Sequence, residues 1–408
     1  MENTTTTTTL NPSHTTLLIF FFYILLCSSL FISTLAKSTI YNVVDFGAIP
    51  DGITDSTMAF LSAWNIACGS TKPVGIHVPK GHFLIGNATT FRGKCNNKAI
   101  SITIHGTLVA PYDYRVIGDA GYWLTFDHVS GVAIHGGVLD GQGSSLWDCK
   151  NSNTKVNCPI GATSLAFNNS DDIVITGLKS VNSQLFHIIV IGSHNVKVHG
   201  VKLIAPGNSP NTDGIHIQFS SHVTILKPRI HTGDDCISIG PGTNNLWIED
   251  VACGPGHGIS IGSLGWYLNE PGVKNVTVRR ATFSETQNGF RIKSWGRASN
   301  GFVNDIHFEH ALMTHVQNPI VIDQNYCPFL NGCPSQASGI KISDVTYKDI
   351  SGTSATQVAV KFDCSSRQPC KKIRLENVKL SYKNQNPRAS CIHAGGTALG
   401  AVQPESCL

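Results

Sequence analysis

Acidic, basic and imidazole side chains that could carry out proton transfer gather in four short motifs in the middle of the chain. In sequence order the motifs are "NTD" (211–213), "GDD" (233–235), "GHG" (256–258) and "RIK" (291–293). Negative charges held as close as those of Asp213, Asp234 and Asp235 raise the pKa of at least one carboxyl group. One carboxyl can then stay protonated as an acid while its neighbour acts as an ionised base. The motifs therefore predict general acid–base chemistry.

The spacing of the motifs predicts that they stack. Asp213, Asp235 and His257 follow one another at steps of 22 residues, within the aligned segments "NTDGIHI", "GDDCISI" and "GPGHGISI". If each step is one coil of stacked strands, these side chains form a column with about 4.8 Å per coil. Strict alternation would point Asp213 and Asp235 inward, so we expect both to lie on the bend before their strand.

Alternation along the strands after these bends sorts the side chains into two faces. The residues expected to point inward are Ile215, Ile217, Ile237, Ile239, Ile259, Ile261, Phe290 and Ile292. The residues expected to point outward are His216, Gln218, Ser238, Ser260, Arg291 and Lys293. Arg291 and Lys293 thus join the acids on one surface, where they could bind an anion, pair with the carboxylates or form a solvated face.

A repeated strand pattern must position these motifs. From about residue 100 the chain repeats period-2 segments such as "NVKVHGVKLI" and "NVTVRRATFS". Equivalent positions at Val196, Val223, Leu246, Val276 and Ile306 give steps of 27, 23, 30 and 30 residues. Variable periods of this length with Gly, Asn and Asp turns indicate a parallel β-helix, whose coils bury one another. A Greek-key sandwich is the alternative, but its strands need not repeat one motif in register.

The segment before the repeat predicts a helix over Ser56–Cys68. Its apolar residues Met58, Leu61, Trp64 and Ala67 recur at helical spacing behind Asp55, a candidate N-cap. We expect this helix to cover the open end of the strand stack, where edges and core would otherwise be exposed. The prediction is thus all-β: a single-stranded right-handed parallel β-helix with a short N-terminal capping helix. No linker divides residues 37–408, which predicts one domain.

Residues 1–36 predict a secretory signal peptide. The stretch Thr16–Ile32 is apolar, and "STLA" at Ser33–Ala36 offers small residues for cleavage. A signal anchor is the alternative, because 17 largely apolar residues approach the length of a membrane span. We expect cleavage after Ala36, a secreted extracellular protein and no membrane attachment afterwards.

Cleavage would remove Cys27 and leave 12 of the 13 cysteines, an even number that suggests disulfides in an exported chain. Pairing by proximity in sequence gives Cys149/Cys158, Cys236/Cys253, Cys327/Cys333, Cys364/Cys370 and Cys391/Cys407, and leaves Cys68/Cys95. Zinc is the alternative, but no CxxC or His-x-x-His spacing supports it. Glycosylation sequons at Asn87, Asn168 and Asn275 agree with secretion.

Composition favours a large folded protein and gives little support to nucleic-acid binding. Hydrophobic residues make up 41% of the chain and charged residues 14%. Without residues 1–36, which hold one acid and no Lys or Arg, the chain has 30 basic and 25 acidic side chains, a net charge of +5. This small, dispersed charge is compatible with an anionic partner but does not indicate nucleic acid.

Together, the four motifs and the region from "VDFGAIPDG" to the C-terminal cysteines resemble the polygalacturonases of glycoside hydrolase family 28, plant members above all. The resemblance implies hydrolysis of α-1,4 bonds between galacturonic acid units of pectin, with inversion at the anomeric carbon and without a cofactor or metal. It further implies that Asp234 protonates the leaving oxygen while Asp213 and Asp235 activate water.

The resemblance also implies supporting roles for five other residues. His257 would tune the protonation of the acid. Asn211, Arg291, Lys293 and Tyr326 would bind substrate, with the two cations holding its carboxylates. We expect a monomer that acts within chains rather than at their ends. A pectate lyase-like enzyme, which would need carboxylates arranged for Ca²⁺, and a non-catalytic wall-binding protein are the alternatives.

Overall fold

The structure is a computed structural model that describes residues 1–6, 39–152, 157–328 and 332–408. Residues 39–408 form one compact unit. Beyond its first six residues, the predicted signal peptide lies outside the described part of the chain. Within the described ranges, no helix has the length and apolar character needed to cross a membrane.

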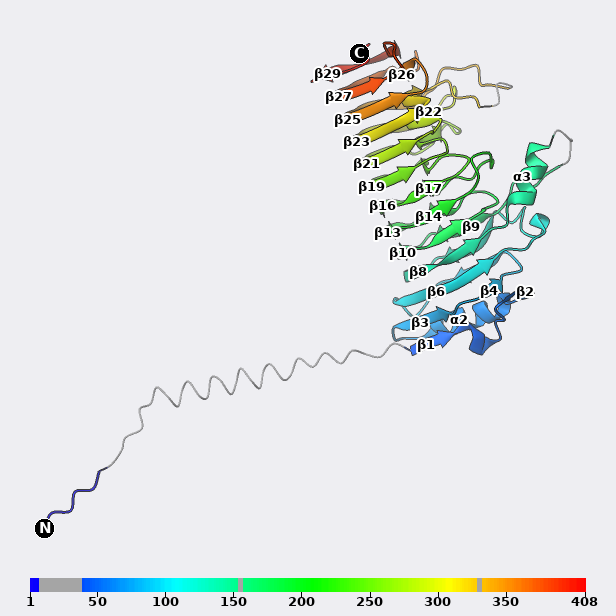
Figure 1. The fold of residues 1–408 in the computed structure, drawn as a ribbon, viewed down its shortest axis with the longest axis vertical. Coiled ribbons are helices and arrows are strands. Elements are labelled where there is room, and N and C mark those ends of the chain that lie inside the picture. The colour runs from blue at the N-terminus through cyan, green and yellow to red at the C-terminus, as the bar shows by residue number, and fades with distance from the viewer. Residues whose placement is uncertain (7–38, 153–156, 329–331) are drawn as a thin grey trace. The chain divides into compact units, whose positions relative to one another are not determined.

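Parallel strands stack coil upon coil into the predicted right-handed parallel β-helix (Figure 1). The described strands form two sheets, one of 11 strands and one of 18. The 11-stranded sheet comprises β5 (Thr89–Arg92), β7 (Tyr122–Asp127), β9 (Thr163–Asn168), β12 (Ile188–Ile191), β15 (Ile215–Gln218), β18 (Ile237–Ile239), β20 (Ile259–Leu264), β22 (Asn288–Ser294), β24 (Asn318–Asp323), β26 (Val358–Asp363) and β28 (Arg388–Ile392).

The 18-stranded sheet wraps the rest of each coil. Its strands are β1 (Thr39–Asn42), β2 (Asp51–Asp55), β3 (Val74–Val78), β4 (His82–Leu84), β6 (Ile100–Val109), β8 (Ser130–Asp140), β10 (Asp171–Thr176), β11 (Lys179–Val181), β13 (His194–His199), β14 (Lys202–Ile204), β16 (Ser221–Leu226), β17 (Arg229–His231), β19 (Asn244–Cys253), β21 (Val273–Ser284), β23 (Phe302–Val316), β25 (Lys341–Ser354), β27 (Cys370–Ser381) and β29 (Ala394–Leu399). Short helices are η1 (Val43–Phe46), η2 (Tyr114–Val116) and α3 (Ser144–Asn151).

The register of the coils agrees with the predicted repeat. Val196 pairs with Val223, Val223 with Leu246, Leu246 with Val276 and Val276 with Ile306. Each of these five side chains is at most 2% exposed, because the inward positions of one coil pack on those of the next. The continuous core that results holds the bends of successive coils in line, and the candidate site lies on those bends.

Helix α2 (Thr57–Gly69) covers the N-terminal end of the stack, as predicted (Figure 1). Its residues Phe60, Trp64 and Ala67 are buried in the core of the β-helix. Two details of the prediction are wrong. Met58 is 71% exposed, because the buried face follows Phe60 and Trp64. Asp55 lies one residue before the N-cap Ser56, although its carboxylate still accepts the Thr57 N–H at 2.9 Å.

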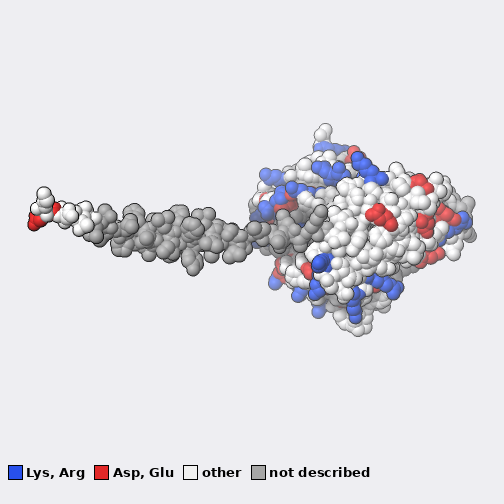
Figure 2. Space-filling view, turned by 90° about the horizontal axis from the view of Figure 1, so that it is seen from below, with Lys and Arg blue, Asp and Glu red and all other residues white. Residues whose placement is uncertain are grey.

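Charged side chains on the end of the stack where α2 lies are spread out (Figure 2). Lys and Arg occur there in small groups around the rim, between Asp and Glu, and a broad area carries no charge. Positive charge on this face is therefore dispersed, as the small net charge of the sequence suggests.

Candidate active site

Residues of three of the motifs line one cleft on the 11-stranded sheet, and His257 of the fourth motif contacts Asp234 in that cleft. Strand β15 pairs with β18, β18 with β20, and β20 with β22, so that Ile215, Ile237, Ile259 and Phe290 stand in register. Asp213 and Asp235 lie two residues before their strands, on the bends, as predicted. The cleft, with a volume of about 510 Å³, is lined by Asn211, Asp213, Asp234, Asp235, Lys293 and Tyr326 among others. The sequence motifs thus converge on one surface.

Alternation in these strands also follows the prediction. The eight side chains expected to point inward are all 0% exposed. His216, Gln218 and Ser238 line the cleft. Gly258 shapes the bend after His257: its φ of +88° is a left-handed conformation, and a Cβ there would lie 2.1 Å from the Asn288 carbonyl oxygen.

Asp235 is the most enclosed of the three acids and the most strongly paired. It is 1% exposed, and its Oδ1 accepts hydrogen bonds from Arg291 at 2.7 Å and from Ser260 at 2.8 Å. Its Oδ2 accepts one from Lys293 Nζ at 2.7 Å. Burial alone would raise the pKa of Asp235, but the Lys293 and Arg291 cations outweigh it and lower that pKa to about 2. Asp235 is therefore ionised at mildly acidic and at neutral pH.

Asp213 is in the opposite electrostatic state. It is 6% exposed, and its Oδ2 accepts a hydrogen bond from Ser238 Oγ at 2.6 Å. Burial, followed by the negative charges of Asp234 and Asp235, raises the pKa of Asp213 well above its usual value. The Ser238 hydroxyl in turn lies 2.8 Å from His216 Nδ1. Asp213 and Asp235 thus bind protons with very different strength, although they stand on adjacent coils.

Asp234 presents one oxygen to its own loop and the other to the cleft. Its Oδ1 accepts the Asp235 backbone N–H at 2.8 Å and lies 2.9 Å from His257 Nδ1. Its Oδ2 is contacted only weakly, by Asn211 Nδ2 at 3.4 Å. Of the two oxygens, Oδ2 is therefore the one available to exchange a proton with a bound molecule.

Arg291 and Lys293 are partners of an acid rather than free cations. Their side chains are 10% and 9% exposed, and both bind Asp235. Lys293 lines the cleft, whereas Arg291 lies beside it, bound to Ser260 and Asp235. Of the alternatives considered for the two cations, pairing with the carboxylates is what the structure contains.

Aromatic residues that belong to none of the motifs complete the cleft. Phe186 and Phe219 line it, as do Trp266 and Trp295. Trp295 lies two residues after Lys293, the end of the "RIK" motif, and Phe186 precedes Asp213 by one coil, 27 residues earlier. Their place in the repeat is therefore the signal that could have identified them.

Disulfides brace the coils around the cleft. The structure joins the same six cysteine pairs that proximity in sequence suggested. Cys236–Cys253 connects the residue after Asp235 to the end of β19, and the two cysteines are 17 positions apart in sequence. Such a loop contributes roughly 3 kcal/mol in the chain-entropy model. Cys391–Cys407 ties down the C-terminal end.

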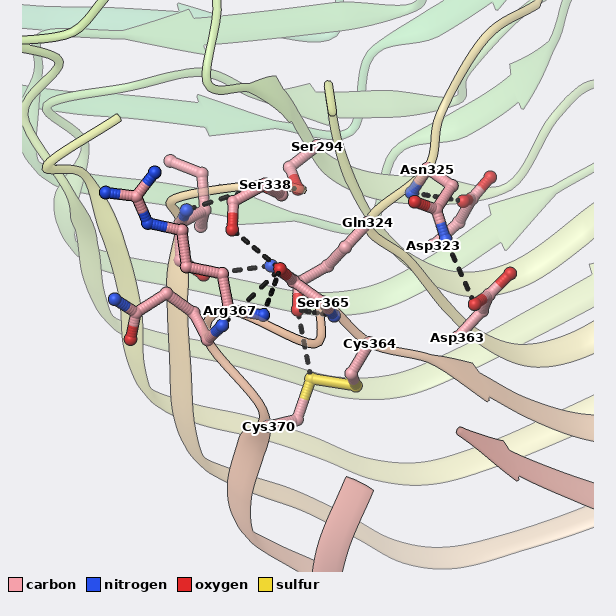
Figure 3. The surroundings of a disulfide bond; sticks show 12 residues. Ser294, Asp323, Gln324, Asn325, Ser338, Asp363, Cys364, Ser365, Arg367 and Cys370 are labelled. Atoms are coloured by element: carbon pink, nitrogen blue, oxygen red, sulfur yellow. Dashed lines mark hydrogen bonds between the residues drawn. A yellow bond between two sulfur atoms is a disulfide. The ribbon is translucent and has the colours of Figure 1, made fainter. Parts of the chain in front are cut away.

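The Cys364–Cys370 disulfide lies beside a network of buried polar side chains (Figure 3). Gln324 accepts the Ser365 N–H at 2.9 Å and donates to the Ile340 carbonyl at 2.9 Å. The Ser365 hydroxyl donates to the Ser338 carbonyl at 2.7 Å, and the Ser338 hydroxyl lies 2.9 Å from that of Ser294. Ser294 directly follows Lys293, so the network extends to the strand that carries Lys293.

The three sequons differ in accessibility. Asn87 and Asn275 are exposed. Asn168 is half-buried, and its side-chain oxygen is enclosed without a hydrogen-bond partner. Attachment of a glycan, which uses the side-chain nitrogen, is sterically easier at Asn87 and Asn275, and glycosylation of all three remains a prediction.

Among the described residues, one group of three potential metal ligands occurs: Asp234, Asp235 and His257, with ligand atoms within 4.8 Å of one another. Two cations already bind Asp235, and their charges would repel a metal ion at this place. The donor set therefore suits proton chemistry better than metal binding.

The sequence is similar over most of its length to a known protein family and to plant enzymes. The model of "Glycosyl hydrolases family 28" matches residues 68–398. A polygalacturonase of Prunus persica is 61% identical over 376 residues, which cover 92% of this chain and 95% of that protein. An exopolygalacturonase of Platanus acerifolia is 41% identical, over 90% of this chain and 98% of that protein.

Solved structures show the same fold at lower identity. An endo-xylogalacturonan hydrolase from Aspergillus tubingensis superposes with a TM-score of 0.77 at 23% identity and covers 90% of this chain and 100% of its own. An exopolygalacturonase from Thermotoga maritima gives 0.69 at 20% identity, over 86% of this chain and 91% of its own. From the family match and the identity to plant relatives, this chain belongs to glycosyl hydrolase family 28.

Proposed function

We propose that this glycoside hydrolase is a polygalacturonase that hydrolyses α-1,4 bonds between galacturonic acid units of pectin. The observation that carries the proposal is the set of three carboxyl groups in unlike environments at one cleft. Asp235 is held ionised by two cations, whereas the pKa of Asp213 is raised by burial and by its acidic neighbours. A proton donor and an ionised base can therefore coexist, as glycoside hydrolysis requires.

Asp234 is the proposed general acid. Its Oδ1 is occupied by the Asp235 N–H and His257 Nδ1, which fixes the carboxyl group and leaves Oδ2 toward the cleft. A proton on Oδ2 can pass to the leaving glycosidic oxygen. His257, which contacts Oδ1 at 2.9 Å, is the residue proposed to tune the protonation of this acid.

Asp213 and Asp235 are the proposed pair that binds and activates water. When Asp234 is protonated, one of the two charges that raise the pKa of Asp213 is gone, and Asp213 becomes easier to ionise. Both oxygens of Asp235 already accept hydrogen bonds, so Asp235 is poorly available as a nucleophile toward the sugar. Water is therefore the proposed nucleophile, and inversion is the proposed outcome.

The short distance between acids is unusual for inversion. Oxygens of Asp234 and Asp235 approach within 4.8 Å, below the roughly 6.5–9.5 Å between carboxyl groups of most inverting enzymes. Proton NMR of the first product formed decides the outcome: release of the β-anomer supports inversion, and release of the α-anomer contradicts it.

Action within chains is proposed in preference to action at chain ends. Aromatic side chains line the cleft on both sides of the acids. Phe186 and Phe219 belong to the coils on the N-terminal side, and Trp295 and Tyr326 follow Lys293 on the C-terminal side. Such a lining supports binding of sugars on both sides of the cleaved bond. Sizing the products of polygalacturonate over time tests this: early oligomers of mixed length support it, and monomer alone contradicts it.

The reaction itself is tested by an assay that separates hydrolysis from elimination. We expect the enzyme to release reducing ends from polygalacturonate at acidic pH, and EDTA should not lower the rate. No unsaturated product that absorbs ultraviolet light should form. Loss of activity with chelator, or full activity at pH 9, would favour the lyase alternative.

The proposed setting is the extracellular cell wall. Six disulfides and family membership support secretion, and cleavage after Ala36 would release the domain of residues 37–408. One chain holds all of the proposed site residues, which supports a monomer. Light scattering of the secreted protein checks the oligomeric state.

A further inference from the structure

A run of three aromatic rings extends along the cleft wall from Lys293 to a second cation, Arg297. Lys293 Nζ lies 5.2 Å from the ring centre of Tyr326. The ring centres of Tyr326 and Trp295 are 5.2 Å apart, and those of Trp295 and Trp266 are 5.0 Å apart. The guanidinium carbon of Arg297 lies 4.1 Å from the centre of the Trp266 ring. A cation therefore stands at each end of the run.

The two cations differ in their partners. Lys293 is bound to Asp235 at 2.7 Å. Arg297 forms no ion pair with any acid in the described part of the chain, and its contacts are with the rings of Trp266 and Trp295. A guanidinium stacked on a ring keeps its N–H groups pointing outward in its own plane. Those groups match the two oxygens of a carboxylate.

The stack is held in place before any ligand binds. Glu270, which is 7% exposed, accepts the backbone N–H groups of Gly265 and Trp266 and closes the loop between them. Trp266 borders both the main cleft and an adjoining hollow of about 440 Å³ that Arg297 also lines. A ligand that leaves the acids along the aromatic run would thus meet Arg297 without rearrangement of the loop.

We propose that Arg297 binds the carboxylate of a uronic acid unit outside the cleaved pair of sugars, with that sugar seated against Trp266. The inference rests on the proposed function, because a polyuronate carries one carboxylate per sugar. Arg297 stands three rings away from Lys293 and touches none of the three acids, so it acts on binding and not on the reacting bond. It would make the enzyme prefer unesterified pectin.

The test compares three variants by their kcat and KM. Arg297→Met keeps an unbranched side chain over the indole and removes the charge, whereas Arg297→Lys keeps the charge and loses the planar fork. Arg280→Met, on the 18-stranded sheet, is the matched control. On polygalacturonate we expect KM to rise roughly tenfold for Arg297→Met, the size of a lost charge-assisted hydrogen bond, with kcat retained. The KM of Arg297→Lys should lie between those of the wild type and Arg297→Met. The KM of the control Arg280→Met should equal that of the wild type.

The decisive measurement is the KM of the same variants on highly methyl-esterified pectin. There the KM of Arg297→Met should equal that of the wild type, because the carboxylate is absent. An equal rise in KM on both substrates would mean that Arg297 only props Trp266, and an unchanged KM on polygalacturonate would remove any role. Failure of the proposed function looks different: the wild type would then hydrolyse neither substrate. Calorimetric binding of oligogalacturonate to wild type and Arg297→Met would in that case still decide the inference, with equal affinities overturning it.

Discussion

Two clusters of basic and acidic side chains lie on neighbouring coils of the β-helix and differ in burial. On the 18-stranded sheet, Arg280 of β21 binds Glu249 and Asp250 of β19, and its side chain is 45% exposed. On the 11-stranded sheet, Arg291 and Lys293 of β22 bind Asp235 and are 10% and 9% exposed. The backbone offers the same parallel ladder in both places.

The difference lies in what water can do. At Arg280, solvent screens the charges, so the ion pairs add little to stability. At Asp235, the acid and its cations are desolvated together, so each group depends on the other for its charged state. A repeated coil therefore becomes a candidate active site where its outward side chains are sheltered by the cleft.

Replacement of Asp234 by Asn should cause the largest loss. Asn keeps the size of Asp234 and most of its hydrogen bonds but cannot supply a proton from Oδ2. We expect kcat on polygalacturonate to fall roughly 10²–10⁴-fold, as for loss of a general acid, with substrate still bound. Steady-state kinetics and calorimetric binding check this, and an unchanged kcat would move the acid role to Asp213.

Replacement of Asp235 by Asn should be the most damaging to folding. It leaves Arg291 and Lys293 buried without an acid between them, and an uncompensated buried charge costs about 3–5 kcal/mol. Urea unfolding near pH 6 measures the loss. Lys293→Met is the matched comparison: it leaves a one-to-one pair of Asp235 and Arg291 and should cost less. Equal losses for the two variants would mean that the cluster is not electrostatically coupled.

Replacement of Lys293 by Ala tests whether this cation also serves the substrate. If Lys293 holds a uronate carboxylate in addition to Asp235, KM on polygalacturonate should rise roughly 10- to 100-fold. The effect should nearly vanish on methyl-esterified pectin, where that charge is absent. Equal damage on both substrates would identify Lys293 as a structural partner of Asp235 alone.

The sequence predicts the column of active-site residues better than it predicts the ion pairs around Asp235. The column of Asp213, Asp235 and His257 follows from equal steps of 22 residues, because a parallel ladder converts equal spacing into registered pairs. The ion pairs of Asp235 do not follow from spacing, since alternation fixes the face of a strand and not the direction in which a long side chain reaches.

Loops were less predictable than strands. The Trp266–Arg297 stack depends on a loop closed by the buried carboxylate of Glu270, and no periodicity encodes that contact. The sequence predicts helix α2 but places its apolar face wrongly at Met58. The buried face is set by Phe60, which packs against Phe83, and by Trp64, which packs against Phe91. In the loop and in the helix, side-chain contacts that have no periodicity in the sequence determine the structure.

The pH dependence of stability should reflect the two buried aspartates with opposite signs. The folded-state pKa of Asp235 is about 2, below the usual 3.8, so its contribution is present above pH 3.8 and is lost as pH falls toward 2. The folded-state pKa of Asp213 is raised, so its contribution is present below pH 3.8 and is lost as pH rises through the raised value.

These two aspartates therefore place their joint optimum on the acidic side of neutrality. Urea midpoints measured from pH 3 to pH 8 check this in the wild type and in Asp213→Asn. The variant cannot ionise at position 213, so it should lose less stability between pH 4 and pH 8 than the wild type. Parallel curves above pH 4 would show that Asp213 titrates normally.

Replacement of Arg280 by Ala should have the smallest effect of all. The variant removes an arginine that pairs with two acids, Glu249 and Asp250, whereas Arg291 and Lys293 each pair with one. Because water solvates the carboxylates that remain, we expect the Tm to change by at most about 2 °C and kcat and KM to stay as in the wild type. Differential scanning calorimetry at low and high salt measures the change, and added salt should shrink it further by screening. A large loss of stability would mean that burial is not what separates the two clusters, and the coupling argued for Asp235 would then need another cause.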